Sequence, residues 1–339
     1  MKIAVVGLGA VGGLMAARLA RAGFAVSALA RGATLAAVRE RGLGVQIDGT
    51  QWSTPVEVAG DARDLGPQDL VVLALKGPAL LDAAASLAPL LDPRTIVLPA
   101  MNGVPWWFLR AAPALERGPA LADPLKSVDP DGRIAAALPL QQVLGCVVHF
   151  SCSSPEPGVV RHGFGNRLIV GEPAGGPSPR TQAVCDTLAR AGFSAEASPD
   201  IRKDIWYKLW GNMTTNPISA LTGATTDRIL DDPLVHAFML RAMAEAAEIG
   251  SHIGCPIAQT GEERMVITRQ LGGFRTSMLQ DALAGRPLEI DALVAAVHEI
   301  GGRVGVAAPN IGALLGLTRL MARERGLYPR QPADSVTGA

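Results

Sequence analysis

Apolar positions in the first hundred residues follow two alternating spacings. Short, mainly apolar runs at residues 2–6, 25–29, 70–75 and 95–100 predict strands, and the continuous apolar run at 70–75 is typical of a strand buried on both faces of a sheet. The stretches between them, at 11–22, 33–41 and 78–90, have the 3.6-residue spacing of helices. Repeated strand–helix–strand units predict a parallel sheet covered by helices.

The next hundred residues predict further strands. Residues 45–53 read as a hairpin that turns at Asp48-Gly49. A strand is expected at 145–150, and two antiparallel strands, Val159–Arg161 and Arg167–Val170, are expected around a turn at His162-Gly163. Residues 106–144 hold several prolines and a turn signal at 129–132, so we expect an irregular excursion from the sheet, and residues 178–191 predict a helix.

After Asp200 almost the whole chain has helical spacing, most clearly at 234–249, 290–304 and 311–323. A boundary near residues 195–200 therefore separates an α/β half from an all-α half. We expect a Rossmann-like domain over residues 1–197, a helical domain over 198–330 and a flexible tail over 331–339.

Composition excludes several classes of protein. The 339 residues carry 31 Lys+Arg and 31 Asp+Glu, and this zero net charge argues against a dedicated nucleic-acid binder. No apolar run reaches the roughly 18 residues of a membrane span, and the first strand is too short and too soon broken by glycine for a signal peptide. The four cysteines form no C-x-x-C pair and lie at no metal-ligand spacing, so we expect reduced thiols and no metal. These features predict a soluble cytoplasmic protein.

A glycine-rich loop follows the first predicted strand and opens the first helix: Gly7, Leu8, Gly9, Ala10, Val11 and Gly12. In this position the first glycine permits a tight turn, the second lets the backbone approach a pyrophosphate, and the third packs the helix on the strand. The free N–H groups of the helix N-terminus attract the phosphates. The loop therefore predicts a dinucleotide site.

The end of the second strand indicates which dinucleotide binds. An NAD site usually has an acidic residue there to hold the ribose 2′-hydroxyl. This chain has Arg31 instead, and no carboxylate before Glu40. Arg31 is suited to a 2′-phosphate, which favours NADPH, although an arginine in a loop can also be simply solvated.

A lone cation stands in an apolar helical stretch of the second half. Lys208 is the only charged residue from Ile205 to Thr226. Asn212, Thr215 and Asn216 lie on or near its helical face. A partly desolvated lysine can donate a proton, because burial lowers its pKa towards working pH. It can equally extend its ammonium group to solvent.

Other polar residues have two interpretations each. Ser277 and Asp281 share a helical face, but Ser277 can be a helix N-cap and Asp281 a first-turn charge. Glu289 can cap the helix that follows it. Lys76 and Asn102 end predicted strands, where ligands bind in open α/β sheets, although Asn102-Gly103 is also a common turn dipeptide.

Taken together, these residues resemble the ketopantoate reductase family. The matching pieces, in family order along nearly the whole chain, are GLGAVGG from Gly7, ALARG to Gly32, LALKG around Lys76, MNG from Met101, IWYKLWGNMTTNPISALT from Ile205 and TSMLQDALAGRPLEID from Thr276.

The resemblance implies a Rossmann domain that binds NADPH and a helical domain that closes over it, with a 2-oxo acid in the cleft. Lys208 would be the general acid, and Glu289 would bind the substrate hydroxyl and help set the ionisation of the lysine. Asn102, Asn212, Asn216, Ser277 and Asp281 would hold the substrate, with Asn102 also at the nicotinamide end. Arg31, Lys76 and the glycine loop would anchor the cofactor. A homodimer is one possible assembly, which the sequence alone does not determine.

Two departures bear on the substrate. Met101 stands where the family more often has a polar residue, and the irregular segment 106–144 is longer than in the compact family form. Three hypotheses therefore remain: reduction of ketopantoate (2-dehydropantoate) to pantoate in pantothenate biosynthesis, reduction of another 2-oxo acid or carbonyl compound, and a catalytically silent NADP(H)-binding sensor.

Overall fold

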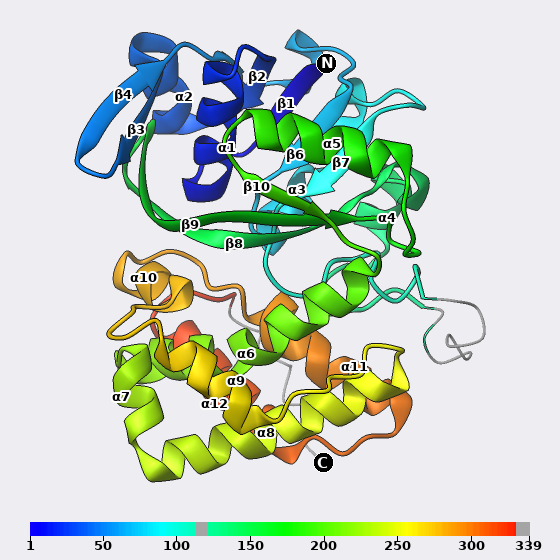
Figure 1. Ribbon diagram of the computed structural model, residues 1–339, viewed down its shortest axis with the longest axis vertical. Coiled ribbons are helices and arrows are strands. Elements are labelled where there is room, and N and C mark those ends of the chain that lie inside the picture. The colour runs from blue at the N-terminus through cyan, green and yellow to red at the C-terminus, as the bar shows by residue number, and fades with distance from the viewer. Residues whose placement is uncertain (113–120, 122, 330–339) are drawn as a thin grey trace, which may run out of the picture. The chain divides into compact units, whose positions relative to one another are not determined.

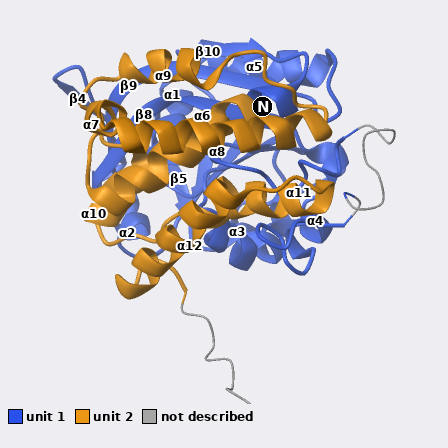
Figure 2. Ribbon diagram, turned by 90° about the horizontal axis from the view of Figure 1, so that it is seen from below, with its two compact units in different colours: residues 1–205 blue, residues 206–339 orange. Residues whose placement is uncertain are grey.

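In the computed structural model, which describes residues 1–112, 121 and 123–329, the chain divides into two compact units. Unit 1 spans Met1–Ile205 and unit 2 spans Trp206–Ala339, coloured blue and orange in Figure 2. The division falls inside helix α6 (Ile201–Thr222), whose start lies close to the boundary expected near 195–200. The domain limits 1–197 and 198–330 stay predictions, and the tail at 331–339 lies outside the described residues.

A five-stranded parallel sheet forms the centre of unit 1 (Figure 1). Its order is β5-β2-β1-β6-β7, with bounds Glu57–Ala59, Ala25–Leu29, Lys2–Val6, Leu70–Leu73 and Ile96–Pro99. The crossovers carry α1 (Ala10–Arg21), α2 (Gly32–Arg41), and α3 (Gly77–Ala83) followed by a 3₁₀ helix, η2 (Ala84–Leu90); a short 3₁₀ turn, η1 (Ala62–Asp64), follows β5. The Rossmann-type parallel sheet is confirmed. Its strand β6 is buried along its whole length, as the continuous apolar run at 70–75 indicated.

A second, mixed sheet was not predicted as a separate layer. Its strands are β3 (Leu43–Ile47), β4 (Thr50–Thr54), β8 (Gly145–Glu156), β9 (Val159–Gly171) and β10 (Ser194–Ala197). The predicted hairpin between β3 and β4 is confirmed, with positive φ at both Asp48 and Gly49 as its tight turn requires. Helix α1 packs against strands of both sheets, whose apolar side chains share one core.

The turn expected at His162-Gly163 is wrong. Strand β9 runs unbroken through these residues, and the chain reverses before it, at Gly158, where φ is +77°. The antiparallel pairing of β8 with β9 is irregular here, since Ser151 pairs with Phe164 but Cys152 pairs with His162. Glycines at 163 and 165 therefore accommodate β-bulges: Gly165 has φ +74°, and a Cβ there would lie 2.6 Å from the His149 carbonyl oxygen.

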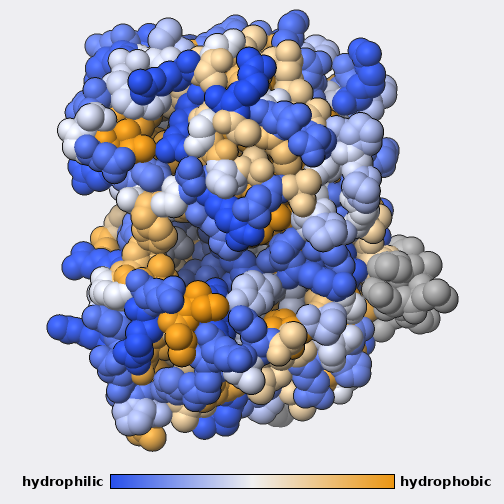
Figure 3. All heavy atoms as spheres, in the orientation of Figure 1, coloured by the Kyte–Doolittle hydropathy of each residue, from blue (hydrophilic) through white to orange (hydrophobic). Residues whose placement is uncertain are grey.

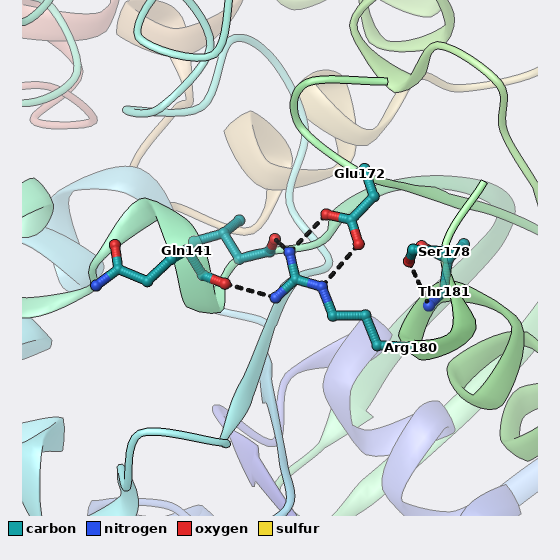
Figure 4. Close-up of polar contacts among 6 residues, drawn as sticks. Gln141, Glu172, Ser178, Arg180 and Thr181 are labelled. Carbon is teal, nitrogen blue, oxygen red and sulfur yellow. Dashed lines mark hydrogen bonds and ion pairs between the residues drawn. The ribbon is translucent and has the colours of Figure 1, made fainter. Parts of the chain in front are cut away.

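An arginine ties helix α5 (Pro179–Arg190) to the chain around the second sheet (Figure 4). Arg180 forms a two-pronged ion pair with Glu172, at 2.7 and 2.5 Å, and also donates to the carbonyl oxygens of Gln141 and Val143. The guanidinium hydrogen bonds lower the pKa of Glu172. Ser178 caps α5 by accepting from the Thr181 N–H, as a helix N-terminus requires.

The described part of 106–144 contains two short elements, α4 (Arg133–Ala137) and a 3₁₀ turn, η4 (Leu140–Gln142). The turn signal at 129–132 is confirmed, since the Gly132 N–H donates to the Asp129 carbonyl at 3.1 Å. The buried Asp129 carboxylate accepts from the N–H groups of Ile134 and Ala135, which satisfies the start of α4. The described part of the segment is thus irregular in backbone yet packed, with Trp106 and Trp107 both buried.

Unit 2 is helical throughout its described residues. Its elements after α6 are α7 (Thr226–Asp231), α8 (Pro233–His252), α9 (Gly261–Arg269), α10 (Ser277–Leu283), a π-helical turn η5 (Asp291–Ala295), α11 (Ala296–Val304) and α12 (Pro309–Glu324). The three helices predicted most clearly are confirmed, except that the middle one begins as a π turn. Trp206 and Trp210 join α6 to α8 by donating to the carbonyl oxygens of Ala246 and Met243.

The cysteines and the possibility of a membrane span are the remaining sequence features. None of the four cysteines, all of which lie in the described residues, forms a disulfide. Three are buried, and burial raises the pKa of the half-buried Cys152 to about 12. None of the described helices combines the length and apolar character needed to span a bilayer.

Candidate active site

The three glycines of the loop after β1 have different surroundings. Gly7 has φ +95°, and a Cβ there would lie 2.8 Å from the Ala74 carbonyl oxygen. A Cβ on Gly12 would lie 2.0 Å from the Gly7 carbonyl oxygen, so only glycine allows α1 to approach the strand so closely. Gly9, the N-cap of α1, would point its Cβ into open space. The loop therefore has a tight turn and close packing on one side, and exposed backbone on the other.

The rest of the loop completes the start of α1. Leu8 is buried, Ala10 is the first helical residue, and Ala10 and Val11 are half-buried. No side chain caps this helix start, so its first N–H groups point outwards without a side-chain acceptor. This arrangement suits a phosphate group. Gly13 allows α1 to pack closely on the second sheet, because a Cβ there would lie 2.5 Å from the side chain of Val160 of β9.

Parallel strand ends bring four predicted residues to one edge of the sheet. The Gly7 N–H donates to the Leu29 carbonyl two residues before Arg31, and Ala74, two residues before Lys76, donates to Val6. Ala100, two residues before Asn102, donates in turn to Leu73. Arg31 is exposed and extended at the N-cap of α2, whereas Lys76 and Asn102 are half-buried. The sequence indicated that these residues lie at the ligand-binding side of the sheet, because each of them follows the carboxyl end of a predicted parallel strand.

Helix α6 carries the second predicted set. Lys208 and Asn212 are half-buried and Asn216 is buried, and their four-residue spacing places them on one face of the helix. Trp206 and Trp210 anchor a different face to α8, which fixes how α6 is rotated. Thr215 is buried and donates to the Gly211 carbonyl one turn earlier, so its hydroxyl is engaged within the helix.

The alternatives for the third set are decided by local geometry. Thr276, not Ser277, is the N-cap of α10, since its hydroxyl accepts from the Leu279 N–H; Ser277 is exposed. Asp281 lies in the last turn of α10 rather than the first, and forms an ion pair with Arg286 at 2.8 Å. The N-cap of the π turn is Ile290, so the half-buried Glu289 does not occupy that capping position.

The structure thus places two groups of predicted residues, each within its own unit. Unit 1 holds the glycine loop, Arg31, Lys76 and Asn102 along one sheet edge; unit 2 holds Lys208, Asn212 and Asn216 on α6, with Ser277, Asp281 and Glu289 on and after α10. Sequence reasoning missed Arg264 of α9, whose guanidinium packs against Gly211. The available signal was Gly211 itself, an isolated glycine inside a predicted helix.

Comparison with protein families covers both units. The family model "Ketopantoate reductase PanE/ApbA" matches residues 3–116, and "Ketopantoate reductase PanE/ApbA C terminal" matches residues 200–322. A 2-dehydropantoate 2-reductase from Mesorhizobium japonicum is 43% identical over 329 residues, which is 97% of this chain and 100% of the relative.

Solved structures give the same result. A candidate ketopantoate reductase from Ralstonia solanacearum MolK2 is 57% identical, with a TM-score of 0.92 over 96% of this chain and 99% of that one. The 2-dehydropantoate 2-reductase from Geobacter metallireducens GS-15 is 25% identical, with a TM-score of 0.81 over 95% and 100% of the two chains. A D-mandelate dehydrogenase solved with NADH and anilino(oxo)acetate shares the fold at 19% identity, with a TM-score of 0.83 over 96% and 100%.

Proposed function

Because the chain belongs to the ketopantoate reductase family, whose members use NADPH to reduce ketopantoate to pantoate, we propose that this protein catalyses that step of pantothenate biosynthesis. It is an NADP-dependent oxidoreductase. The observation that carries the proposal is the 43% identity to a 2-dehydropantoate 2-reductase over 97% of this chain. The two family models span both the glycine loop and the lysine of α6.

The sheet edge of unit 1 supports the cofactor assignment. Gly7, Leu8, Gly9, Ala10, Val11 and Gly12 would hold the pyrophosphate, because the open space at Gly9 and the uncapped start of α1 fit that group. Arg31 would pair with the 2′-phosphate, and Lys76 and Asn102 would hold the remainder of the cofactor. When bound, NADPH supplies the hydride.

Lys208 supports the proton-transfer half of the reaction. Reducing a ketone leaves an alkoxide that must be stabilised and protonated, and a half-buried ammonium group can do both. In this proposal Lys208 donates its Nζ proton to the substrate oxygen and Glu289 binds the substrate hydroxyl. Asn102, Asn212, Asn216, Ser277 and Asp281 orient the substrate, with Asp281 doing so from its ion pair with Arg286.

The direct test follows NADPH absorbance with purified protein and ketopantoate, alongside a panel of other 2-oxo acids and the Lys208→Ala variant. Loss of the general acid is expected to lower kcat about 10²- to 10⁴-fold while NADPH affinity stays nearly unchanged. Preference for another member of the panel would reassign the substrate. NADPH binding without oxidation of any carbonyl compound would favour the sensor hypothesis.

Assembly and location complete the proposal. We propose a cytoplasmic homodimer that acts on a small molecule, without nucleic-acid or membrane partners. Exposed apolar side chains on unit 2 helices, among them Leu234, Leu317 and Leu320, support pairing of subunits. Figure 3 shows that one face of the protein carries apolar patches among hydrophilic residues. A ketopantoate reductase from Staphylococcus aureus is described as dimeric. Light scattering during size-exclusion chromatography measures the assembly directly.

A further inference from the structure

Arg264, on helix α9, is a half-buried cation without a counter-charge among the described residues. Its guanidinium forms no hydrogen bond or ion pair there, and its Nε is fully buried without an acceptor. The guanidinium lies over the Tyr207 ring, whose centroid is 5.2 Å from Cζ. Burial accordingly lowers the pKa of Arg264, although arginine remains charged.

The carboxylates nearest to Arg264 in sequence are engaged elsewhere. Glu262 pairs with His236 at 3.0 Å, and Glu263 closes the capping box of α9 with Thr260. A desolvated charge without a partner is costly, so proteins generally keep one only where something else compensates it. The Tyr207 ring supplies part of this compensation, but it provides no acceptor for the buried Nε–H group.

The guanidinium occupies the space of a missing side chain on α6. A Cβ built on Gly211 would lie 2.9 Å from Nη2 and 3.1 Å from Cζ of Arg264. Position 211 is three residues after Lys208, and side chains at this spacing are neighbours on a helix, with their Cβ atoms about 5–6 Å apart. Glycine at 211 therefore lets α9 place a cation against α6 one helical turn after the position of the proposed general acid.

We propose that Arg264 binds the carboxylate of the 2-oxo acid substrate. In such an acid the carboxylate is bonded directly to the ketone carbon, so a proton donor at the ketone oxygen requires its carboxylate partner close by. Arg264 packs on Gly211, one turn of α6 after Lys208, and this placement fits that requirement. A guanidinium can bind a carboxylate through two parallel N–H groups. The inference rests on the proposed function and adds a specificity-determining residue to it.

The test compares ketopantoate with its lactone, the internal ester in which the carboxylate and the substrate hydroxyl are joined and neither is free. Because each compound is measured with both proteins, the effect of changing Arg264 is obtained separately for each compound. Calorimetry in the presence of NADP⁺ measures binding of both compounds without turnover, for the wild type and for Arg264→Gln. Loss of a charge-assisted bidentate contact is expected to weaken ketopantoate binding about 10- to 100-fold and to leave lactone binding nearly unchanged. The same ratio is expected in KM, with a smaller change in kcat.

Two further variants keep the test decisive if Arg264→Gln is unstable. Arg264→Lys keeps the charge but not the fork, and is expected to recover part of the affinity for ketopantoate. Gly211→Ala should displace the guanidinium and weaken ketopantoate binding selectively, while alanine favours the helix. Equal losses for ketopantoate and its lactone, or no loss for ketopantoate, would overturn the proposal. If the wild type binds ketopantoate through Arg264 but oxidises no NADPH, the proposed reaction fails and the carboxylate site stands.

Discussion

Two glycines of the loop after β1 have opposite steric requirements. Gly12 has no room for a Cβ, because its nearest neighbour is a backbone carbonyl oxygen that cannot rotate away. Gly9 has room for one within the protein, but that room is where a pyrophosphate would lie. Gly12 is therefore required by the fold, and Gly9 is free for the role in pyrophosphate binding proposed above.

Alanine substitutions separate these two roles. Gly12→Ala is expected to lower the free energy of unfolding by about 3 kcal/mol or more, since a backbone clash forces α1 away from β1. Gly9→Ala is expected to change stability by less than about 0.5 kcal/mol yet weaken NADPH binding at least tenfold. Denaturant unfolding and fluorescence titration measure the two quantities. Unchanged NADPH affinity in Gly9→Ala would argue against the pyrophosphate position.

A half-buried phenol near the end of the described chain gives a pH prediction. Tyr328 donates to Asp291 at 2.6 Å, and burial, followed by this hydrogen bond, raises the pKa of Tyr328 to about 12. The sequence contains two tyrosines, so Tyr207→Phe isolates the signal of Tyr328. Ultraviolet titration of this variant should show little tyrosinate at pH 11, where a free tyrosine is about 90% ionised. Half-ionisation near pH 10 would contradict the hydrogen bond.

The same shift has a consequence for stability. Because the folded pKa lies above the ordinary value near 10, the contribution of Tyr328 is fully present below pH 10 and is lost as pH rises towards 12. Tyr328→Phe is expected to cost about 1 kcal/mol near neutral pH, since it removes the hydrogen bond to Asp291. Denaturant unfolding at pH 7 and pH 10.5 checks both statements.

At the scale of elements, Arg180 holds α5 to the end of β9 and to the η4 region (Figure 4). Glu172 is its carboxylate partner, and the pKa of this glutamate is lowered by that contact. A carboxyl group with a lowered folded pKa stabilises the protein above its ordinary pKa, near 4.5, and this stabilisation disappears as pH falls through the folded value.

Glu172→Gln is therefore expected to cost about 2 kcal/mol at pH 7 and progressively less below about pH 4.5. The wild type and variant curves of unfolding free energy against pH should converge on the acid side. Glu196→Gln is a matched control, because the Arg167–Glu196 pair is more exposed and should contribute no more than about 1 kcal/mol. Equal costs for the two variants would contradict a specific role for the Arg180 contact.

For the whole molecule, cofactor binding should appear as stability. A ligand that binds only the folded protein stabilises it by about 2.7 kcal/mol at 100 times its Kd. NADPH is expected to raise the melting temperature more than NADH at equal concentration, and Arg31→Gln should reduce the NADPH effect while leaving the NADH effect nearly unchanged. Thermal unfolding with each nucleotide measures this, and equal shifts from the two would exclude a 2′-phosphate contact at Arg31.

Much of this organisation was predictable from sequence because it depends on residues close together in the chain. Buried parallel strands need continuous apolar runs, helices need 3.6-residue spacing, and the loop from Gly7 to Gly12 has its glycines where a phosphate-binding turn requires them. The resemblance of the motifs from Gly7 to Asp291 also identified the family before any fold was seen. These features follow from short-range sterics and burial.

The tertiary structure decided what depends on distant partners. Glycines at 163 and 165 signal either a turn or a bulge, and only the pairing of β9 with β8 selects the bulge. Thr276 rather than Ser277 caps α10 because the actual helix start fixes which hydroxyl reaches the Leu279 N–H. The buried Nε of Arg264 without an acceptor could be recognised only from the packing of α9 on Gly211. Whether a charged group has a partner depends on residues that are far apart in the chain and meet only in the folded protein.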